Sequence, residues 1–238
     1  MPAIGSKLDA TELSTVAVIA ASNIVLNRTL PRGVEIPAGL AAAGVVALIA
    51  LGSDATRADA GFDAEALPAG ARLGLKLGAP IGTAIMLGAF SNRLRGFYDR
   101  ERMASTGVSE ALYQFGLRIP FATAAAEEII FRGGLEAVLR LRRSPNRAAL
   151  LASMLFGAWH VLPTLDRMKV DQSLAKMHDG SVLRKAAGVA ATVAATFVAG
   201  LGFSLLRRQT GSIVAPIIVH ASFNGGGYIG SWLRSRAR

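Results

Sequence analysis

The chain contains no cysteine, and this absence removes several chemistries at once. Disulfide bonds, a Cys₂His₂ zinc site and a cysteine nucleophile are all excluded. Histidine is scarce too, since His160, His178 and His220 are the complete set. Charged residues make up only 18% of the 238 residues, which is fewer than an ordinary soluble domain carries.

Apolar residues are abundant instead, at 52% of the chain with a mean hydropathy of +0.41. Runs without a formal charge recur at residues 13–27, 36–53, 77–92, 148–165, 186–206 and 209–233. With the longer, charged stretch 108–141, they predict an all-α, polytopic helical membrane protein with about seven transmembrane helices around an intramembrane polar cavity. No long polar linker interrupts them, so we expect residues 1–238 to form a single membrane domain. Residues 54–76 read as a loop with an interfacial helix.

The net charge of +10 could indicate a nucleic-acid partner, but the Lys and Arg residues cluster between apolar runs. That distribution is typical of the flanks of membrane spans, so we expect membrane lipid and no nucleic acid as partners. The cluster of Arg140, Arg142, Arg143 and Arg147 does not fit strict alternation of the spans, and the orientation stays open.

Two adjacent glutamates interrupt apolar sequence at AAAEEIIFRGG, residues 124–134. On a helix, Glu127 and Glu128 point about 100° apart, and Arg132 lies four residues after Glu128. Glu128 therefore has a partner on its own helix, and Glu127 has none. An unpaired carboxylate in apolar surroundings takes up a proton or serves as a base or ligand. Pro120 is expected to kink this helix one to two turns earlier.

Two histidines also fall within apolar runs, where an ionisable side chain is a functional hypothesis by default. Phe156 precedes His160 by four residues, and His220 precedes Asn224 by four, so each pair shares a helix face. The apolar run that contains His160, residues 148–165, is expected to break after Pro163. His178 lies in the polar connection 166–185 and is expected to be solvated.

Structural roles compete with functional ones at several of these positions. The Glu128–Arg132 pair suits a structural role, and either histidine alone could join helices through a hydrogen bond. Asn224 alone more often packs helices, and Phe156 and Trp159 suit a wall or core. Gly188, Thr192, Thr196 and Gly200 form a stripe of small residues that lets another helix approach closely.

Several familiar motifs do not apply. Gly225, Gly227 and Gly230 spell GxGxxG, but they end an apolar run and no strand precedes them, so a dinucleotide site is rejected. No HExxH, GxSG or GxGD sequence occurs.

The segments AEEIIFRGGLEAVL, MLFGAWHVL and TGSIVAPIIVHASFN, in this order, resemble the CPBP family of intramembrane proteases. That family includes the type II CAAX prenyl endopeptidases and the bacterial bacteriocin-processing and immunity proteins. The resemblance covers residues 109–230, whereas residues 1–108 have only generic membrane character.

The resemblance implies a glutamate-dependent endopeptidase in which Glu127 activates water. Glu128 and Arg132 would hold the helix and tune that carboxylate, with Phe156 in support. His160 and His220 would orient the water, and Asn224 with one histidine would stabilise the oxyanion. Glu127, His160 and His220 are also a suitable ligand set for a divalent metal such as zinc, so the cofactor is either none or such a metal.

The expected substrate is a peptide or protein, with or without a lipid group, cut near the membrane surface. The composition, rich in Ala, Arg and Gly, is typical of a bacterial cell membrane protein. A peptide-binding immunity or scaffold protein without catalysis is the main alternative, and a proton-coupled transporter the second. No internal repeat supports transport.

Overall fold

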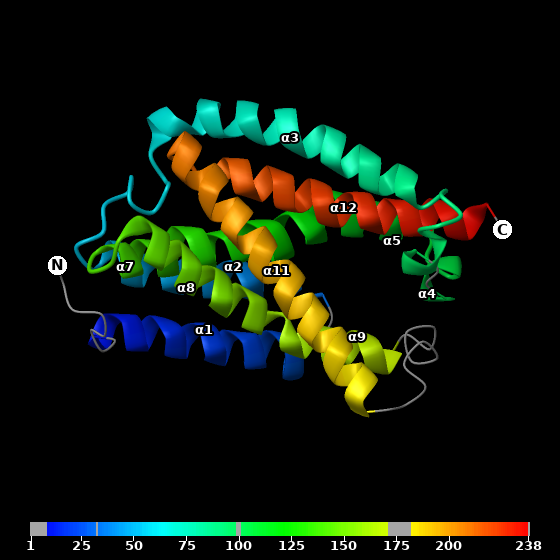
Figure 1. The fold of residues 1–238 in the computed structure, drawn as a ribbon, viewed down its shortest axis with the longest axis horizontal. Helices are drawn as coiled ribbons and strands as arrows, with labels where there is room; N and C mark the ends of the chain where they lie inside the picture. The colour runs from blue at the N-terminus through cyan, green and yellow to red at the C-terminus, as the bar shows by residue number, and fades with distance from the viewer. Residues whose placement is uncertain (1–8, 32, 99–100, 171–181, 238) are drawn as a thin grey trace.

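The computed structural model describes residues 9–31, 33–98, 101–170 and 182–237, and the regular elements in these ranges are helices. They are α1 (Ala10–Arg28), α2 (Glu35–Leu51), η1 (Ala64–Ala66), α3 (Leu67–Gly88), η2 (Arg95–Phe97), α4 (Glu101–Ala104), α5 (Val108–Tyr113), η3 (Gln114–Ala125), α6 (Ala126–Glu128), η4 (Ile129–Leu135), α7 (Glu136–Arg140), α8 (Pro145–Trp159), α9 (Val161–Val170), α11 (Val182–Thr210) and α12 (Val214–Arg236). Most of the long helices lie roughly side by side, and α11 crosses them obliquely (Figure 1).

Three helical segments in the described ranges are long and apolar enough to cross a membrane: Ala10–Arg28, Pro145–Met168 and Val182–Thr210. Glu35–Leu51 is apolar but shorter. Large apolar side chains also lie on the outer surface, with Leu48 70% exposed. The predicted all-helical architecture is confirmed, whereas the count of about seven spans and the intramembrane cavity stay predictions.

Two predicted boundaries were wrong. Residues 67–76 are not a separate interfacial helix, because α3 begins at Leu67 and runs through them to Gly88. Arg72 and Lys76 are exposed on this helix, where long side chains can extend toward water. The break in the apolar run 148–165 comes at His160 rather than after Pro163. Pro163 lies in the first turn of α9, where its missing N–H removes no helical hydrogen bond.

Glycines set the closest helix contacts. The most extensive helix contact is that between α3 and α12. A Cβ on Gly226 would come within 2.3 Å of the Gly82 carbonyl oxygen, and one on Gly78 within 2.7 Å of Ser222 Oγ. These contacts fix α12, the helix that carries His220, against α3.

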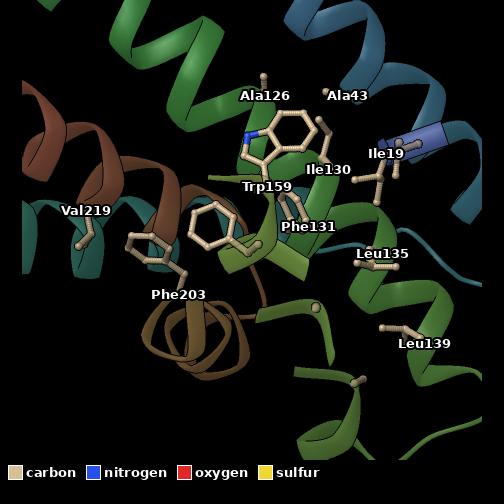
Figure 2. Close-up of a cluster of buried hydrophobic side chains, with 14 residues drawn as sticks. Ile19, Ala43, Ala126, Ile130, Phe131, Leu135, Leu139, Trp159, Phe203 and Val219 are labelled. Carbon is tan, nitrogen blue, oxygen red and sulfur yellow. The ribbon is translucent and has the colours of Figure 1, made fainter. Parts of the chain in front are cut away.

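The main hydrophobic core surrounds the helix that contains the glutamate pair. Figure 2 shows Ile130, Phe131 and Leu135 of that helix packed with Trp159 and Phe203 from α8 and α11. Side chains from α1, α2 and α12 complete the cluster. The glutamates thus lie on the central helix of the bundle.

Candidate active site

The two glutamates lie in the short element α6, between the π-helical stretches η3 and η4. π-Helical turns are rare in proteins and often occur at functional sites. Pro120, the predicted kink, lies inside η3. Gly134 gives α2 room beside this helix, since a Cβ there would lie 2.4 Å from Val46 Cγ1. The glycines of the motif therefore serve close packing, which holds the glutamates on a rigid segment.

Glu127 is buried at 8% exposure, and its two carboxylate oxygens have different surroundings. Oε1 accepts a hydrogen bond from the Trp159 indole, with Nε1 at 3.2 Å. Oε2 has no hydrogen-bond partner among the described residues. It faces two imidazoles, with His220 Nε2 at 3.8 Å and His160 Nε2 at 3.9 Å. The carboxylate is thus held by one oxygen and presents the other to both histidines.

The hydrogen bonds of the two histidines assign their tautomers. His160 Nδ1 lies 2.8 Å from the Phe156 carbonyl oxygen, which can only accept. His220 Nδ1 lies 2.9 Å from Glu128 Oε1. Each Nδ1 therefore carries the proton, and in the neutral ring Nε2 presents a lone pair. Three acceptor atoms, two Nε2 and Glu127 Oε2, then face one another. Such a group requires a donor or a cation between its members.

Glu128 and Arg132 form the predicted pair within one helix, with Arg132 Nη1 3.2 Å from Glu128 Oε1 and neither side chain exposed. The same carboxylate oxygen accepts from His220 Nδ1. The family resemblance implied that Glu128 and Arg132 hold the helix and tune the Glu127 carboxylate, and in the structure the Glu128 carboxylate contacts Arg132 and His220. Glu128 therefore contacts both the buried Arg132 guanidinium and the His220 imidazole, and it fixes the orientation of that imidazole.

Aromatic rings enclose this network. Phe156 meets the His160 ring edge-on, with centroids 4.7 Å apart, and the His220 ring at 6.0 Å. Arg132 Cζ lies 4.3 Å from the Phe156 centroid and 5.3 Å from that of Phe203. A guanidinium over aromatic faces gains electrostatic stabilisation away from water. Phe156 is thus the common wall of both histidines and the arginine.

Asn224 lies one turn beyond His220 on α12 and is partly buried. Among the described residues, no hydrogen bond or ion pair joins its side chain to Glu127, His160 or His220. The structure therefore brings three of the four predicted catalytic residues together. The fourth, Asn224, lies one helical turn from His220 without a hydrogen bond to the other three. His178 lies outside the described residues.

Sequence reasoning missed the roles of Trp159 and Phe203 at this site. Trp159 was interpreted as wall or core, yet its N–H bonds Glu127. Its own carbonyl oxygen accepts from Asn23 Nδ2 at 2.9 Å, which ties α1 to α8. Phe203 stacks on His220, with centroids 4.9 Å apart and 18° between the planes. The position of Trp159 directly before His160 was the available signal; Phe203 had none.

The atoms that face Glu127 Oε2 include the kinds of ligand that a divalent metal binds. Two imidazole Nε2 atoms and one unpartnered carboxylate oxygen suit zinc, and carboxylate or carbonyl partners on each Nδ1 are usual for metal-binding histidines. Ligand atoms of a tetrahedral zinc lie about 3.3 Å apart, from bond lengths near 2.05 Å. The spacings of 3.8 and 3.9 Å are wider, and the described residues contain no ready-made metal group. The types of ligand atom suit a divalent metal. The distances from Glu127 Oε2 to the two Nε2 atoms accommodate a water molecule without the side chains moving closer together.

Comparison with known proteins gives one result. The model of the family described as "Type II CAAX prenyl endopeptidase Rce1-like" matches residues 109–226. No curated protein and no solved structure matches the chain. The matched range contains every residue of the cluster built around Glu127, and begins at the position expected from the motifs. Through residues 109–226 the chain belongs to the Rce1-like family of type II CAAX prenyl endopeptidases.

Proposed function

We propose that the protein is an intramembrane endopeptidase in which Glu127 activates the attacking water. The observation that carries this proposal is the convergence of Glu127 Oε2 with the Nε2 atoms of His160 and His220. A water molecule between these atoms can donate its two hydrogens to two of them, which leaves its lone pairs free. The family supports peptidase activity at a membrane.

In the proposed reaction, water oxygen attacks the carbonyl carbon of the scissile peptide bond as Glu127 Oε2 takes the proton. The carbonyl oxygen becomes an oxyanion, which the Asn224 amide N–H stabilises. One histidine adds a donor to this oxyanion when its Nε2 also carries a proton, because its Nδ1–H is already bonded to the protein. Collapse of this intermediate breaks the C–N bond, and Glu127 returns the proton to the leaving nitrogen. Water, one new carboxylate and one new amine balance the reaction.

The surrounding residues have positioning roles in this scheme. Trp159 holds Oε1, so the reactive oxygen Oε2 stays directed at the histidines. Glu128 holds His220 through Nδ1, and Arg132 forms an ion pair with Glu128 beside Phe156. A bound divalent metal would be held by Glu127, His160 and His220 and would polarise the water and the carbonyl. We treat residues 1–238 as one membrane domain that presents this site to a peptide or protein substrate.

The test compares peptide termini in membranes from cells that produce wild type, Glu127→Gln or Glu136→Gln. Glu136 is the matched control, because it is also a fully buried glutamate on the same helix and its carboxylate accepts from Ser204 Oγ at 2.7 Å. We expect new termini with wild type and Glu136→Gln and none with Glu127→Gln at equal protein levels. Equal termini in all three membranes would support the peptide-binding scaffold instead.

A further inference from the structure

A second concentration of charge lies where the α7–α8 turn meets the end of α11. Figure 1 shows these segments toward one end of the molecule, near the connection from α2 to α3. They line a half-open pocket of about 340 Å³, a volume within the usual range of small-molecule sites. Its lining residues are Ala58, Arg140, Pro145, Arg207, Arg208 and Gly211. Half of them are arginines, and none is acidic.

The arginines come from different elements, and two of them are fixed by hydrogen bonds. Arg207 is 2% exposed and donates from Nη2 to the backbone carbonyl oxygens of Ala58 and Asp59. Arg208 Nη1 donates to Asn146 Oδ1 at 2.7 Å. Arg140 has no hydrogen bond or ion pair within the described ranges. A guanidinium carries five N–H donors, so each of the three retains donors for a ligand.

The charges around this pocket leave it cationic. The charged groups that interact electrostatically with Arg207 are two further arginines and two carboxylates. They are Arg140, Arg208, Glu136 and Asp59. Hydrogen bonds from the Thr56 side chain and backbone hold the pKa of Asp59 below its ordinary value, so it stays ionised. The Glu136 carboxylate accepts from Ser204. Three arginines thus outnumber two carboxylates, so the pocket has a net positive charge, which suits an anion such as a phosphodiester.

The depth of the pocket along α11 indicates the source of that phosphodiester. Residues 186–206 carry no charge and would span about 31 Å as a helix, close to the ~30 Å hydrocarbon core of a bilayer. Arg207 and Arg208 follow directly, and Arg184 and Lys185 flank the other end of the run. The pocket therefore lies at the level of lipid headgroups.

We propose that Arg140, Arg207 and Arg208 bind the phosphodiester of an anionic phospholipid headgroup. Arginine suits this ligand because its planar fork of donors matches phosphate oxygens. The site is separate from the cluster around Glu127, since Arg140 lies thirteen residues further along the same helical segment, up to about 20 Å away. A lipid in this pocket would join α7, α8 and α11 at one membrane face.

The test measures retention of lipid by the full chain in detergent, using native mass spectrometry. Phosphatidylglycerol is the anionic probe and phosphatidylcholine the zwitterionic one. The pocket variant is Arg140→Gln with Arg208→Gln, which leaves the buried Arg207 in place. The matched control is Arg93→Gln with Arg95→Gln, two exposed arginines in the segment that follows α3. Figure 1 shows the end of α3 toward the opposite end of the molecule from the α7–α8 turn.

We expect wild type and the control variant to prefer phosphatidylglycerol, and the pocket variant to bind it at least tenfold more weakly. Arg208→Gln alone, at an exposed position, should give an intermediate loss of phosphatidylglycerol binding. This single variant provides the test if the double variant folds poorly. Equal losses in the pocket and control variants would overturn the proposal, as would no preference for phosphatidylglycerol in wild type. Displacement of the lipid by millimolar inorganic phosphate would assign the pocket to a free phosphate ion and also overturn it.

Discussion

Glu127 and Glu136 are buried carboxylates nine residues apart on one helical segment, and their surroundings differ in kind. Glu136 Oε2 accepts from a serine hydroxyl, Glu136 Oε1 has no hydrogen-bond partner among the described residues, and the carboxylate lies near the charges of Arg207 and Arg132. Glu127 has a tryptophan N–H on one oxygen and two histidine Nε2 atoms opposite the other. The fold places cations near the buried carboxylate of Glu136, whereas the Glu127 carboxylate faces acceptor atoms and needs a ligand, water or a proton between them.

Glu128 shows the same contrast at close range. It follows Glu127 directly, yet it pairs with Arg132 and with His220 Nδ1. Glu12, the buried glutamate of α1, likewise pairs with Arg143. The presence of arginine beside a carboxylate thus separates the structural glutamates from the proposed catalytic one.

The largest effect is expected at Glu127. With a substrate found from the membrane termini, Glu127→Gln should lower kcat by about 10³-fold or more, since general base catalysis typically contributes 10²–10⁴-fold. Glu136→Gln should stay within about threefold of wild type. Steady-state cleavage by the purified proteins measures both. Comparable losses in the two variants would remove the distinction between these carboxylates.

The next largest effect is on stability, at Arg132. Glu128→Ala leaves this guanidinium buried without its carboxylate, which typically costs about 3–5 kcal/mol of unfolding free energy. The double variant Glu128→Gln with Arg132→Met removes both charges and should recover much of that loss. Unfolding of the purified proteins in detergent compares them. A Glu128→Ala variant as stable as wild type would show that this pair does not stabilise the site.

A smaller loss of stability is expected at Gly200, where α11 passes the pair. A Cβ there would come within 2.8 Å of Arg132 Nη2 and 3.0 Å of Ser153 Oγ, so Gly200→Ala should cost about 1–3 kcal/mol. Gly202 is the matched control on the same helix, since nothing lies within 4 Å of its added Cβ. Gly202→Ala should be neutral or slightly stabilising. The same unfolding assay separates them, and equal shifts would contradict the close approach.

The smallest effect is expected at Trp159, which positions Glu127 without touching the substrate. Trp159→Phe removes the N–H and keeps an aromatic ring, so kcat should fall about tenfold with KM unchanged, the value of one hydrogen bond to a charged group. Trp232→Phe is the control, because its indole N–H bonds the Thr106 carbonyl oxygen instead.

A spectroscopic measurement distinguishes this positioning role from general packing. The indole N–H resonance of Trp159 should shift in Glu127→Gln and stay unchanged in Glu136→Gln, while that of Trp232 should move in neither. An unshifted Trp159 resonance in Glu127→Gln would mean that the two side chains do not interact.

The sequence predicted those features that depend on spacing within one helix. The Glu128–Arg132 pair follows from a separation of four residues, and His160 and His220 stood out because imidazole inside an apolar run is costly. At Gly200, the predicted stripe of small residues indeed faces another element.

Other features depend on contacts between distant segments and had no local signal. The hydrogen bond from His220 to Glu128 spans 92 positions, and that from Trp159 to Glu127 spans 32. The ten extra residues of α3 escaped prediction because Arg72 and Lys76 make its first turns look like a loop, while its glycines pack on α12. Periodicity reports which face of a helix is apolar, but it does not report which side chain of another helix meets it.

The central claim is that Glu127 takes a proton from water and does not itself attack the substrate. A single turnover of the purified wild-type protein in water enriched in ¹⁸O, on the substrate found from the membrane termini, tests it most directly. The account predicts one solvent ¹⁸O in the new C-terminal carboxylate of the product and none in the peptide that contains Glu127. Label in Glu127 with an unlabelled product would show a covalent acyl intermediate on that carboxylate and would contradict the account.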